Sequence, residues 1–226
     1  MSTWILWLIT SLVVGNPFVA LLIVLAIVYL GQAQFTGRYA NPLAFLHSYR
    51  EIAKLRTTIE TNPEDAAARN DLGRILALKG KFAEALPHLE KAHRRSPESA
   101  ETGFFYGYTQ LALGKDEEGL ALIEDALEKK PRLRYGEPYL LTGDVHARLR
   151  RFDAAIPWYE AFTRLSTESV EGFYKLGRCY TEMGRADEAR AAYMSAMVAY
   201  RQAPRYIRRR ERPWYWKARW SRRTAA

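Results

Sequence analysis

The chain repeats itself with a period of about 34 residues, and this periodicity constrains its fold more than any other feature. Four glycines recur 34, 36 and 34 residues apart: Gly73, Gly107, Gly143 and Gly177. A small residue follows each of them by twelve positions: Ala85, Gly119, Ala155 and Ala189. Self-similarity at this period indicates stacked units, each of which buries its apolar face only against its neighbours.

Each unit has the pattern of a helix pair. Leucines such as Leu72, Leu76 and Leu89 recur at helical spacing, which predicts amphipathic helices. A second glycine follows the first by seven residues in three of the units, at Gly80, Gly114 and Gly184. Glycine is suited to the left-handed residue that ends a helix. We therefore expect two helices per unit and an all-α fold.

These spacings resemble the tetratricopeptide repeat (TPR) family, whose helix-turn-helix unit has 34 residues. The prolines Pro63, Pro97 and Pro131, also 34 residues apart, match the family's position after the second helix. The resemblance covers about 140 residues as four units: 66–99, 100–133, 136–169 and 170–203. It implies an α-solenoid over residues 66–203, a right-handed superhelix with a concave groove.

The third unit departs from the family pattern. Arg150 stands where the other units have glycine, and Pro157 falls inside the expected second helix. An interior proline costs about 3 kcal/mol unless the helix bends or starts late. Pro87 occupies a matching place in the first unit, which favours a shared local geometry. Two extra residues near Tyr135 should change the twist before this unit.

Residues 32–65 connect the repeats to the N-terminus. Residues 43–59 form an amphipathic pattern with Leu46, Ile52, Leu55 and Ile59 on one face, followed by Pro63. This pattern is typical of the second helix of a degenerate unit. We expect it to cap the solenoid, because a terminal repeat must cover an otherwise exposed apolar face.

Residues 4–30 contain no charge and are rich in Leu, Ile and Val. At about 1.5 Å per residue, this run can cross a bilayer core of about 30 Å, so residues 1–31 are predicted to hold a transmembrane helix. Gly15-Asn16-Pro17 interrupts the run and predicts a kink, with a membrane hairpin of two short arms as the alternative. A cleaved signal peptide fits less well, because no basic residue precedes the run.

The charges that flank this run predict its orientation. Arg38, Arg50, Lys54 and Arg56 follow it, and no charged side chain precedes it. The positive-inside rule then places the body of the chain in the cytoplasm after a single pass. The architecture, a membrane segment joined to TPR-like repeats, suggests the inner membrane of a bacterium. The lone Cys179 agrees with a reducing compartment, and we expect it to be a core residue.

The resemblance also implies where a partner would bind. TPR proteins hold peptides or helices in a groove lined by the first helix of each unit. Transferred by position, the candidate groove residues are Asn70, Arg74, Phe104, Tyr108, Leu140, Asp144, Arg148, Tyr174 and Arg178. The clamp with which chaperone-binding members hold a C-terminal carboxylate is absent, because Phe105, Glu137 and Leu141 replace its basic positions.

The C-terminal segment, residues 204–226, carries nine basic residues and one acidic residue among several aromatics. This composition favours an anionic membrane surface. The residues expected to contact it are Arg208, Arg209, Arg210, Trp214, Trp216, Lys217 and Trp220. One alternative is a cap, in which Tyr206, Trp214 and Trp216 pack on the last repeat. Another is nucleic-acid binding through phosphate contacts and base stacking.

No arrangement of residues indicates catalysis. The four histidines lie on separate predicted helices or face away from one another, no nucleophile has a partner at a recognisable spacing, and no CxxC pair suggests a metal site. We expect no enzyme activity, cofactor or metal. The sequence predicts a membrane-anchored scaffold that binds a protein partner in its groove. The alternatives are a structural subunit of a larger membrane assembly, and a membrane tether for nucleic acid.

Overall fold

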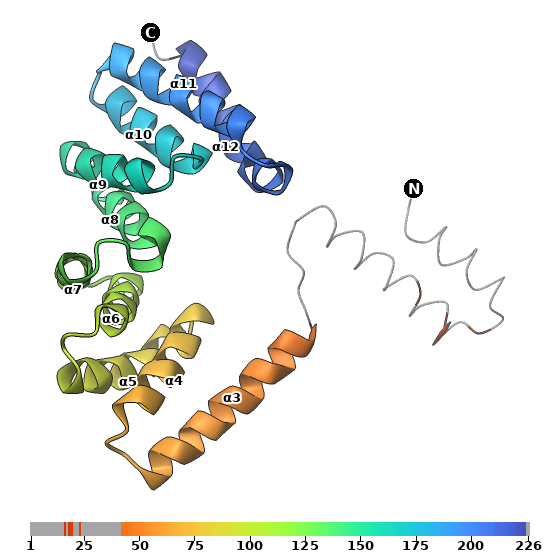
Figure 1. The fold of residues 1–226 in the computed structure, drawn as a ribbon, viewed down its shortest axis with the longest axis vertical. Coiled ribbons are helices and arrows are strands. Elements are labelled where there is room, and N and C mark those ends of the chain that lie inside the picture. The colour runs from red at the N-terminus through yellow and green to blue at the C-terminus, as the bar shows by residue number, and fades with distance from the viewer. Residues whose placement is uncertain (1–15, 17, 20–22, 24–41, 225–226) are drawn as a thin grey trace. The chain divides into compact units, whose positions relative to one another are not determined.

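The computed structural model describes residues 16, 18, 19, 23 and 42–224, and this part of the chain is helical with no strand (Figure 1). The chain divides into two units, Met1–His47 and Ser48–Ala226. The second unit, described below, is an all-α solenoid, as predicted. The predicted membrane run at residues 4–30 lies outside the described residues except for Asn16, Phe18, Val19 and Ile23. Within the part that is described, no helix combines the length and apolar character that crossing a bilayer requires.

Four pairs of helices follow one another along the second unit. The pairs are α4 (Ala66–Leu78) with α5 (Phe82–Arg95), α6 (Ala100–Ala112) with α7 (Asp116–Lys129), α8 (Glu137–Arg148) with α9 (Phe152–Leu165), and α10 (Val170–Glu182) with α11 (Ala186–Gln202). The two helices of each pair pack against each other, and successive pairs are in contact. This arrangement is the stacked helix-turn-helix architecture that the periodicity predicts.

The first helices of three pairs begin at a capping side chain. Asp65 accepts a hydrogen bond from the backbone N–H of Ala68, and Ser99 accepts one from Thr102. Ser169 does the same for Gly172. Each cap satisfies one of the backbone donors that the first turn of a helix leaves without an intrahelical partner.

Small residues allow the paired helices to approach closely. A Cβ atom added to Gly73 would lie 2.5 Å from the side chain of Leu89, and one added to Gly143 would lie 2.7 Å from the ring of Tyr159. Gly177 faces Tyr193 at the same distance of 2.7 Å. The large side chain of the second helix therefore occupies the space that glycine leaves on the first.

The turns inside the pairs use left-handed backbone conformations. Gly80, Gly114 and Gly184 have φ angles of 76°, 82° and 72°, as expected for glycine at the end of a helix. Arg150 occupies the same turn in the third pair with φ 58°. The third turn therefore has the same geometry without glycine, at a conformational cost of about 1–2 kcal/mol.

Pro87 and Pro157 both lie inside continuous helices, α5 and α9, five residues after the helix begins. Both side chains are exposed. Neither proline breaks its helix, so the two positions do share a local geometry, as the sequence indicates.

The two extra residues before the third pair form an irregular connection. Here the 3₁₀ segment η1 (Leu133–Gly136) has left-handed backbone at Arg134 and Tyr135. The hydrophobic core divides into two clusters near this point, with Val145 of α8 in the first and Ala155 of α9 in the second. The inserted residues thus precede the place where one apolar cluster ends and the next begins.

Helix α3 (Pro42–Thr61) precedes the first pair. Ile52 and Ile59 are buried in the first cluster, and Leu55 packs against it. Arg56 pairs with Glu84 of α5 at 3.2 Å. These contacts confirm the predicted inner face of this helix at three positions, whereas the side chain of Leu46 lies outside the described residues.

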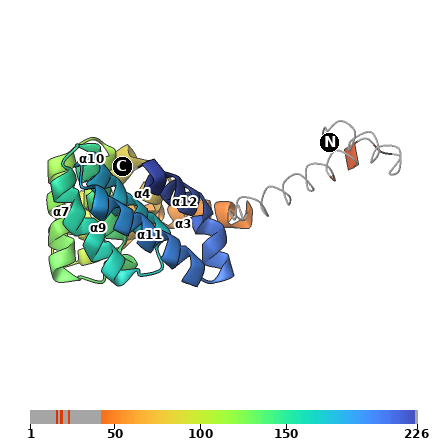
Figure 2. The same ribbon diagram turned by 90° about the horizontal axis from the view of Figure 1, so that it is seen from above.

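The basic C-terminal segment forms a long helix, α12 (Arg205–Thr224). It packs on α10 and α11 at the C-terminal end of the stack (Figure 2). Ala218 is fully buried in the second cluster, against which Trp214 and Tyr215 also pack. The segment therefore covers the last repeat.

Candidate functional site

The candidate groove residues lie on the first helices α4, α6, α8 and α10. In the first two pairs, Asn70 and Tyr108 are half-buried, and Arg74 lies 3.5 Å from Asp71 on its own helix. The ring of Tyr108 stacks on Phe104 and meets the edge of Phe82, with centroid distances of 6.3 and 5.6 Å. This end of the groove offers the half-buried ring of Tyr108 and one half-buried arginine, Arg74.

Phe104 does not belong to the groove surface. Its side chain is 2% exposed and contacts Phe105 and Tyr108 inside the first core cluster. The guanidinium of Arg134 lies 5.4 Å from the ring and covers it. The structure therefore corrects the candidate list, because a side chain buried this deeply cannot contact a partner.

Helices α8, α9 and α10 line a solvent-open cavity of about 280 Å³, which we call the central cavity. Its lining residues come from α8, α9 and α10: Asp144, Ala147, Arg148, Phe152, Tyr159, Lys175, Arg178 and Cys179. Three of the candidate groove residues, Asp144, Arg148 and Arg178, thus meet at one site, as their equivalent positions in consecutive units imply.

The carboxylate of Asp144 is fully engaged in this cavity. One oxygen accepts a 2.7 Å hydrogen bond from the hydroxyl of Tyr159, and the other lies 2.7 Å from Nζ of Lys175. Burial, together with the negative charge of Asp144, raises the pKa of Tyr159 far above its ordinary value, so the phenol stays protonated as a donor. Lys175 also pairs with Glu171 at 2.6 Å. These bonds connect α8 to both α9 and α10.

The remaining charges of the central cavity are positive. Arg148 is 55% exposed and pairs with Asp116 of the preceding unit at 2.7 Å. Arg178 is exposed, and among the described residues no carboxylate forms an ion pair with it. Phe152 adds an apolar wall. The cavity can therefore receive a negatively charged group together with an adjacent apolar one.

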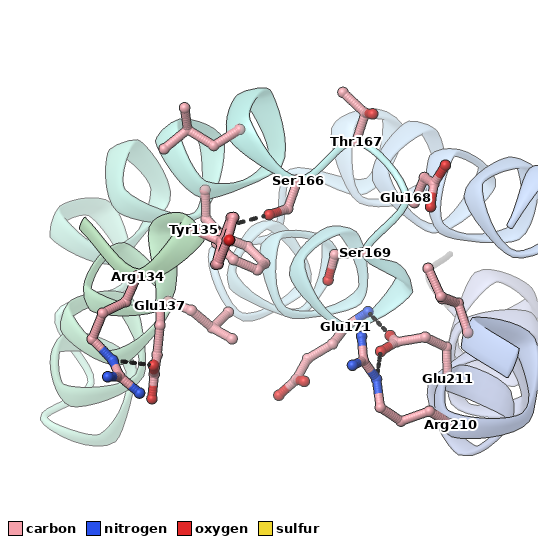
Figure 3. Close-up of a pocket in the computed structure, with 14 residues that line it drawn as sticks. Arg134, Tyr135, Glu137, Ser166, Thr167, Glu168, Ser169, Glu171, Arg210 and Glu211 are labelled. Atoms are coloured by element: carbon pink, nitrogen blue, oxygen red, sulfur yellow. Dashed lines mark hydrogen bonds and ion pairs between the residues drawn. The ribbon is translucent and has the colours of Figure 1, made fainter. Parts of the chain in front are cut away.

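A second cavity, of about 590 Å³, lies where the first turns of α8 and α10 approach the C-terminal helix (Figure 3). We call it the edge cavity; Leu140 is the candidate groove residue that lines it. Arg134 binds Glu137 at 2.7 Å on one side, and Arg210 binds Glu211 at 3.1 Å on the other. Its charged groups are thus largely paired with one another.

The last candidate groove residue, Tyr174, is covered by α12. Its ring lies 5.5 Å from the indole of Trp214 and 5.9 Å from the ring of Tyr193. Tyr174 is half-buried as a result. The C-terminal helix therefore takes the place that a partner would need at this end of the groove.

The candidate residues of the C-terminal segment divide between two faces of α12. Trp214 faces the last repeat, which corrects its assignment to the membrane-contacting set. Trp216 and Trp220 are 50% and 71% exposed, and Arg209, Arg210 and Lys217 are exposed as well. Arg208 is half-buried. The cap alternative is realised at Trp214, but Tyr206, which it also includes, is 76% exposed.

Cys179 is buried, and burial raises the pKa of its thiol to about 11. It is therefore a protonated core residue, as predicted. Within the described part of the chain, no three His, Cys, Asp or Glu side chains gather as they would around a metal ion.

Three residues that give the central cavity its chemistry are not among the candidates predicted from the sequence: Phe152, Tyr159 and Lys175. Lys175 directly follows Tyr174, which is a candidate groove residue, and Phe152 is the first residue of α9, the second helix of its unit. The sequence does contain one signal for Lys175. It follows Asp144 by about one repeat period and carries the opposite charge, which favours an ion pair between consecutive units.

Comparisons with known proteins agree with this geometry. Residues 76–137 and 140–206 match models of the tetratricopeptide repeat, and the two ranges together cover more than half of the chain. The TPR repeat-containing protein YpiA of Bacillus subtilis (strain 168) is 24% identical over 151 residues. That match covers 67% of this chain but only 35% of YpiA, so the chain spans about a third of the length of this relative.

Solved structures show the same fold. The crystal structure of MamA superposes with a TM-score of 0.63 at 19% identity, covering 67% of this chain and 87% of MamA. YrrB, described as a TPR protein with an unusual peptide-binding site, superposes with a TM-score of 0.56 at 21% identity. Here 65% of this chain and 78% of YrrB are covered. At these identities, the likeness establishes the solenoid architecture.

Proposed function

Since this chain belongs to the tetratricopeptide repeat family, we propose that it is a scaffold that binds a segment of a protein partner along its first helices. TPR proteins are generally scaffolds without catalytic activity, and the proposed action here is binding alone. YrrB, a structural neighbour, is described as having a peptide-binding site. We place the contact with this segment at the central cavity, which three of the candidate groove residues line.

The charge of the central cavity specifies the partner. Asp144 is neutralised by Lys175 and Tyr159, which leaves Arg148 and Arg178 as the cations that face solvent. Phe152 lies in the same lining. We therefore propose an acidic segment in which an apolar side chain neighbours a carboxylate. Arg178, a cavity cation without an ion pair among the described residues, is the observation on which this proposal depends.

Peptide binding tests the proposal directly. Fluorescence anisotropy of the full chain would compare a labelled twelve-residue peptide of alternating Glu and Leu with a matched Lys and Leu peptide. We expect only the acidic peptide to bind, and Arg178→Glu to weaken it at least about tenfold, or about 1.4 kcal/mol. Lys91→Glu, an equal charge change on the exposed side of α5, is the control. Equal binding of both peptides, or equal loss in both variants, would contradict the proposal.

We also propose that the scaffold is anchored in the inner membrane, with its repeats in the cytoplasm. Support comes from the uncharged run at residues 4–30 and from the basic residues that follow it. The full chain should stay in the membrane pellet after extraction with alkaline carbonate. A maleimide probe should reach Lys91→Cys only after the inner membrane is permeabilised. Release by carbonate would reject the anchor, and labelling of intact cells would reject the orientation.

A further inference from the structure

Helix α12 has two faces of different character. Its inner face holds Glu211, Trp214 and Ala218 against the last repeat. Its outer face presents three aromatic side chains, Tyr206, Trp216 and Trp220, which are 76%, 50% and 71% exposed. Tyrosine and tryptophan with an apolar body and a polar tip are enriched at the boundary between a bilayer and water.

The single acidic residue of this segment does not reach the outer face. Glu211 is 4% exposed, and its carboxylate accepts a 3.1 Å hydrogen bond from the backbone N–H of Glu171 in the first turn of α10. The same carboxylate lies 3.1 Å from Nε of Arg210. The one acidic side chain of α12 is therefore buried and paired with Arg210, and the exposed charged side chains of this helix are all cationic.

Four arginines gather beside this face. Arg205, Arg208, Arg209 and Arg212 line a shallow cavity of about 420 Å³ together with Tyr200. Tyr200 stacks on Tyr215 at a centroid distance of 4.3 Å. In the described part of the chain, none of these arginines forms an ion pair with a carboxylate. Guanidinium groups bind phosphate oxygens in a bidentate manner, so an uncompensated cluster of this kind is suited to phosphate.

We propose that the outer face of α12 is a docking surface for a bilayer that contains anionic phospholipids. The arginine cavity would hold lipid phosphates, and Tyr206, Trp216 and Trp220 would enter the headgroup region. Phosphate chemistry alone would also suit a nucleic acid. The uncharged run at residues 4–30 favours the lipid, because it would bring this helix to a membrane at high effective concentration.

This inference goes beyond the proposed function, because it concerns a surface that does not include the central cavity. It also removes the conflict between a cap and a membrane-contacting segment. The inner face of α12 caps the solenoid, while the outer face stays available for lipid. Docking at α12 would give the scaffold a second membrane contact besides the anchor and would limit the orientations of the groove.

The test uses the full chain in lipid nanodiscs. Thr224 is exposed at the end of α12, and Thr224→Cys would carry an environment-sensitive NBD dye, since the native Cys179 is buried. Emission would be compared between discs of phosphatidylcholine and discs that also contain phosphatidylglycerol. We expect a blue shift and a brighter signal only in the anionic discs, and a loss of both at high salt.

Two matched triple variants show whether the lipid response depends on the arginines of α12 or only on the net charge of the chain. Changing Arg205, Arg209 and Arg212 to Gln should abolish the response, because each arginine contributes about fivefold to partitioning onto an anionic surface. Changing Lys91, Lys115 and Arg132, which are exposed elsewhere in the solenoid, to Gln removes the same charge and should leave the response intact. Thermal unfolding would verify that both triple variants remain folded.

Three outcomes would overturn the proposal. The first is an equal dye response in neutral and anionic discs, and the second is an equal loss in the two triple variants. The third is no lipid response together with tight, salt-sensitive binding of a single-stranded oligonucleotide, which would assign the surface to nucleic acid. Peptide binding at the central cavity is measured separately, so failure here leaves the proposed function to its own test.

Discussion

The hydroxyl of Tyr159 donates a 2.7 Å hydrogen bond to the carboxylate of Asp144, and Lys175 binds the other oxygen of that carboxylate at the same distance. Tyr159 belongs to α9, Asp144 to α8 and Lys175 to α10. A groove residue predicted to contact partners thus also joins its own repeat to the next. The charge that remains for a partner is consequently that of the arginines.

Replacing Asp144 with Asn should destabilise the solenoid. The amide oxygen can still accept from Tyr159, but Lys175 loses a charged partner and retains only Glu171. Hydrogen bonds to charged groups justify an expected loss of about 1–2 kcal/mol in the free energy of unfolding, measured by urea titration. Glu128→Gln, on the exposed end of α7, should change it by less than about 0.5 kcal/mol. Equal effects would contradict a linking role for Asp144.

Two glycines on α6 should respond to alanine in opposite directions. A Cβ atom at Gly107 would lie 2.7 Å from the backbone oxygen of Gly119, whereas one at Gly103 would lie 3.6 Å from the Cβ of Ala126, an ordinary contact. Gly103→Ala should stabilise the protein by up to about 1 kcal/mol through helix propensity. Gly107→Ala should destabilise it by about 1–3 kcal/mol, because the helices must separate. Thermal unfolding of both variants measures the difference, and a shared sign would reject the close approach at Gly107.

Much of this fold follows from the sequence because a repeated unit presents the same local signals several times. The glycines at Gly80, Gly114 and Gly184 identify the turns, and the position of Arg150 implies the same turn by analogy. Groove positions transfer by the same analogy and bring Asp144, Arg148 and Arg178 to one cavity. Periodicity specifies the place of a side chain along the solenoid, which is sufficient for residues on a regular face.

Burial by non-repeating elements could not be predicted in this way. Phe104 is covered by Arg134, whose position depends on the left-handed backbone of an insertion with no counterpart in the other units. Tyr174 is covered by Trp214 from a helix outside the repeats. The composition of that helix is strongly basic, and composition does not show which residues share its inner face.

Replacing Arg150 with Gly should stabilise the protein. Arg150 has φ 58°, a conformation that costs a non-glycine residue about 1–2 kcal/mol. Its exposed pair with Glu182, at 3.6 Å, offsets only part of this cost. We expect a net gain of about 0.5–1 kcal/mol and a higher melting temperature. Gly114→Arg, the reciprocal change in the second pair, should lower it. A gain or a loss in both variants would show that the turn conformation does not control stability here.

Stability should decrease in mild acid because of His93 and His88. Burial lowers the pKa of each below the ordinary 6.5, with Lys129 adding for His93 and Arg69 for His88, while Asp125 and Glu84 oppose the shift. The unfolded chain therefore binds protons more readily than the folded chain. The free energy of unfolding should be greatest above about pH 7 and fall as the pH drops through about 6.5.

Urea titrations between pH 7.5 and 5.5 measure this dependence. Changing both histidines to Gln should flatten the profile in that range, where aspartate and glutamate side chains remain largely ionised. The native chain, titrated over the same range, serves as the comparison. A profile of the double variant as steep as that of the native chain would assign the acid sensitivity to other groups.

The two tryptophans Trp214 and Trp216 should differ in their effect on the docking of α12. Trp214 contacts Tyr174 at a centroid distance of 5.5 Å, and Lys175 lies 5.6 Å from its ring, whereas Trp216 is 50% exposed on the outer face. Trp214→Ala removes apolar contact with the last repeat and should populate an open state in which α12 is detached. Trypsin cleaves after arginine, except before proline, and the backbone after Arg205, Arg208 and Arg209, which is helical in the docked state, becomes accessible to it when α12 detaches.

Limited proteolysis under native conditions therefore compares the contribution of Trp214 on the inner face of α12 with that of Trp216 on the outer face. When opening is fast relative to cleavage, the cleavage rate follows the population of the open state, so a loss of about 1.4 kcal/mol raises it about tenfold. We expect at least that increase for Trp214→Ala and no more than about twofold for Trp216→Ala. Mass spectrometry should place the early cuts between residues 205 and 212. Equal rates in the two variants would mean that α12 does not hold to the repeats through Trp214, and its outer face would then have no defined orientation.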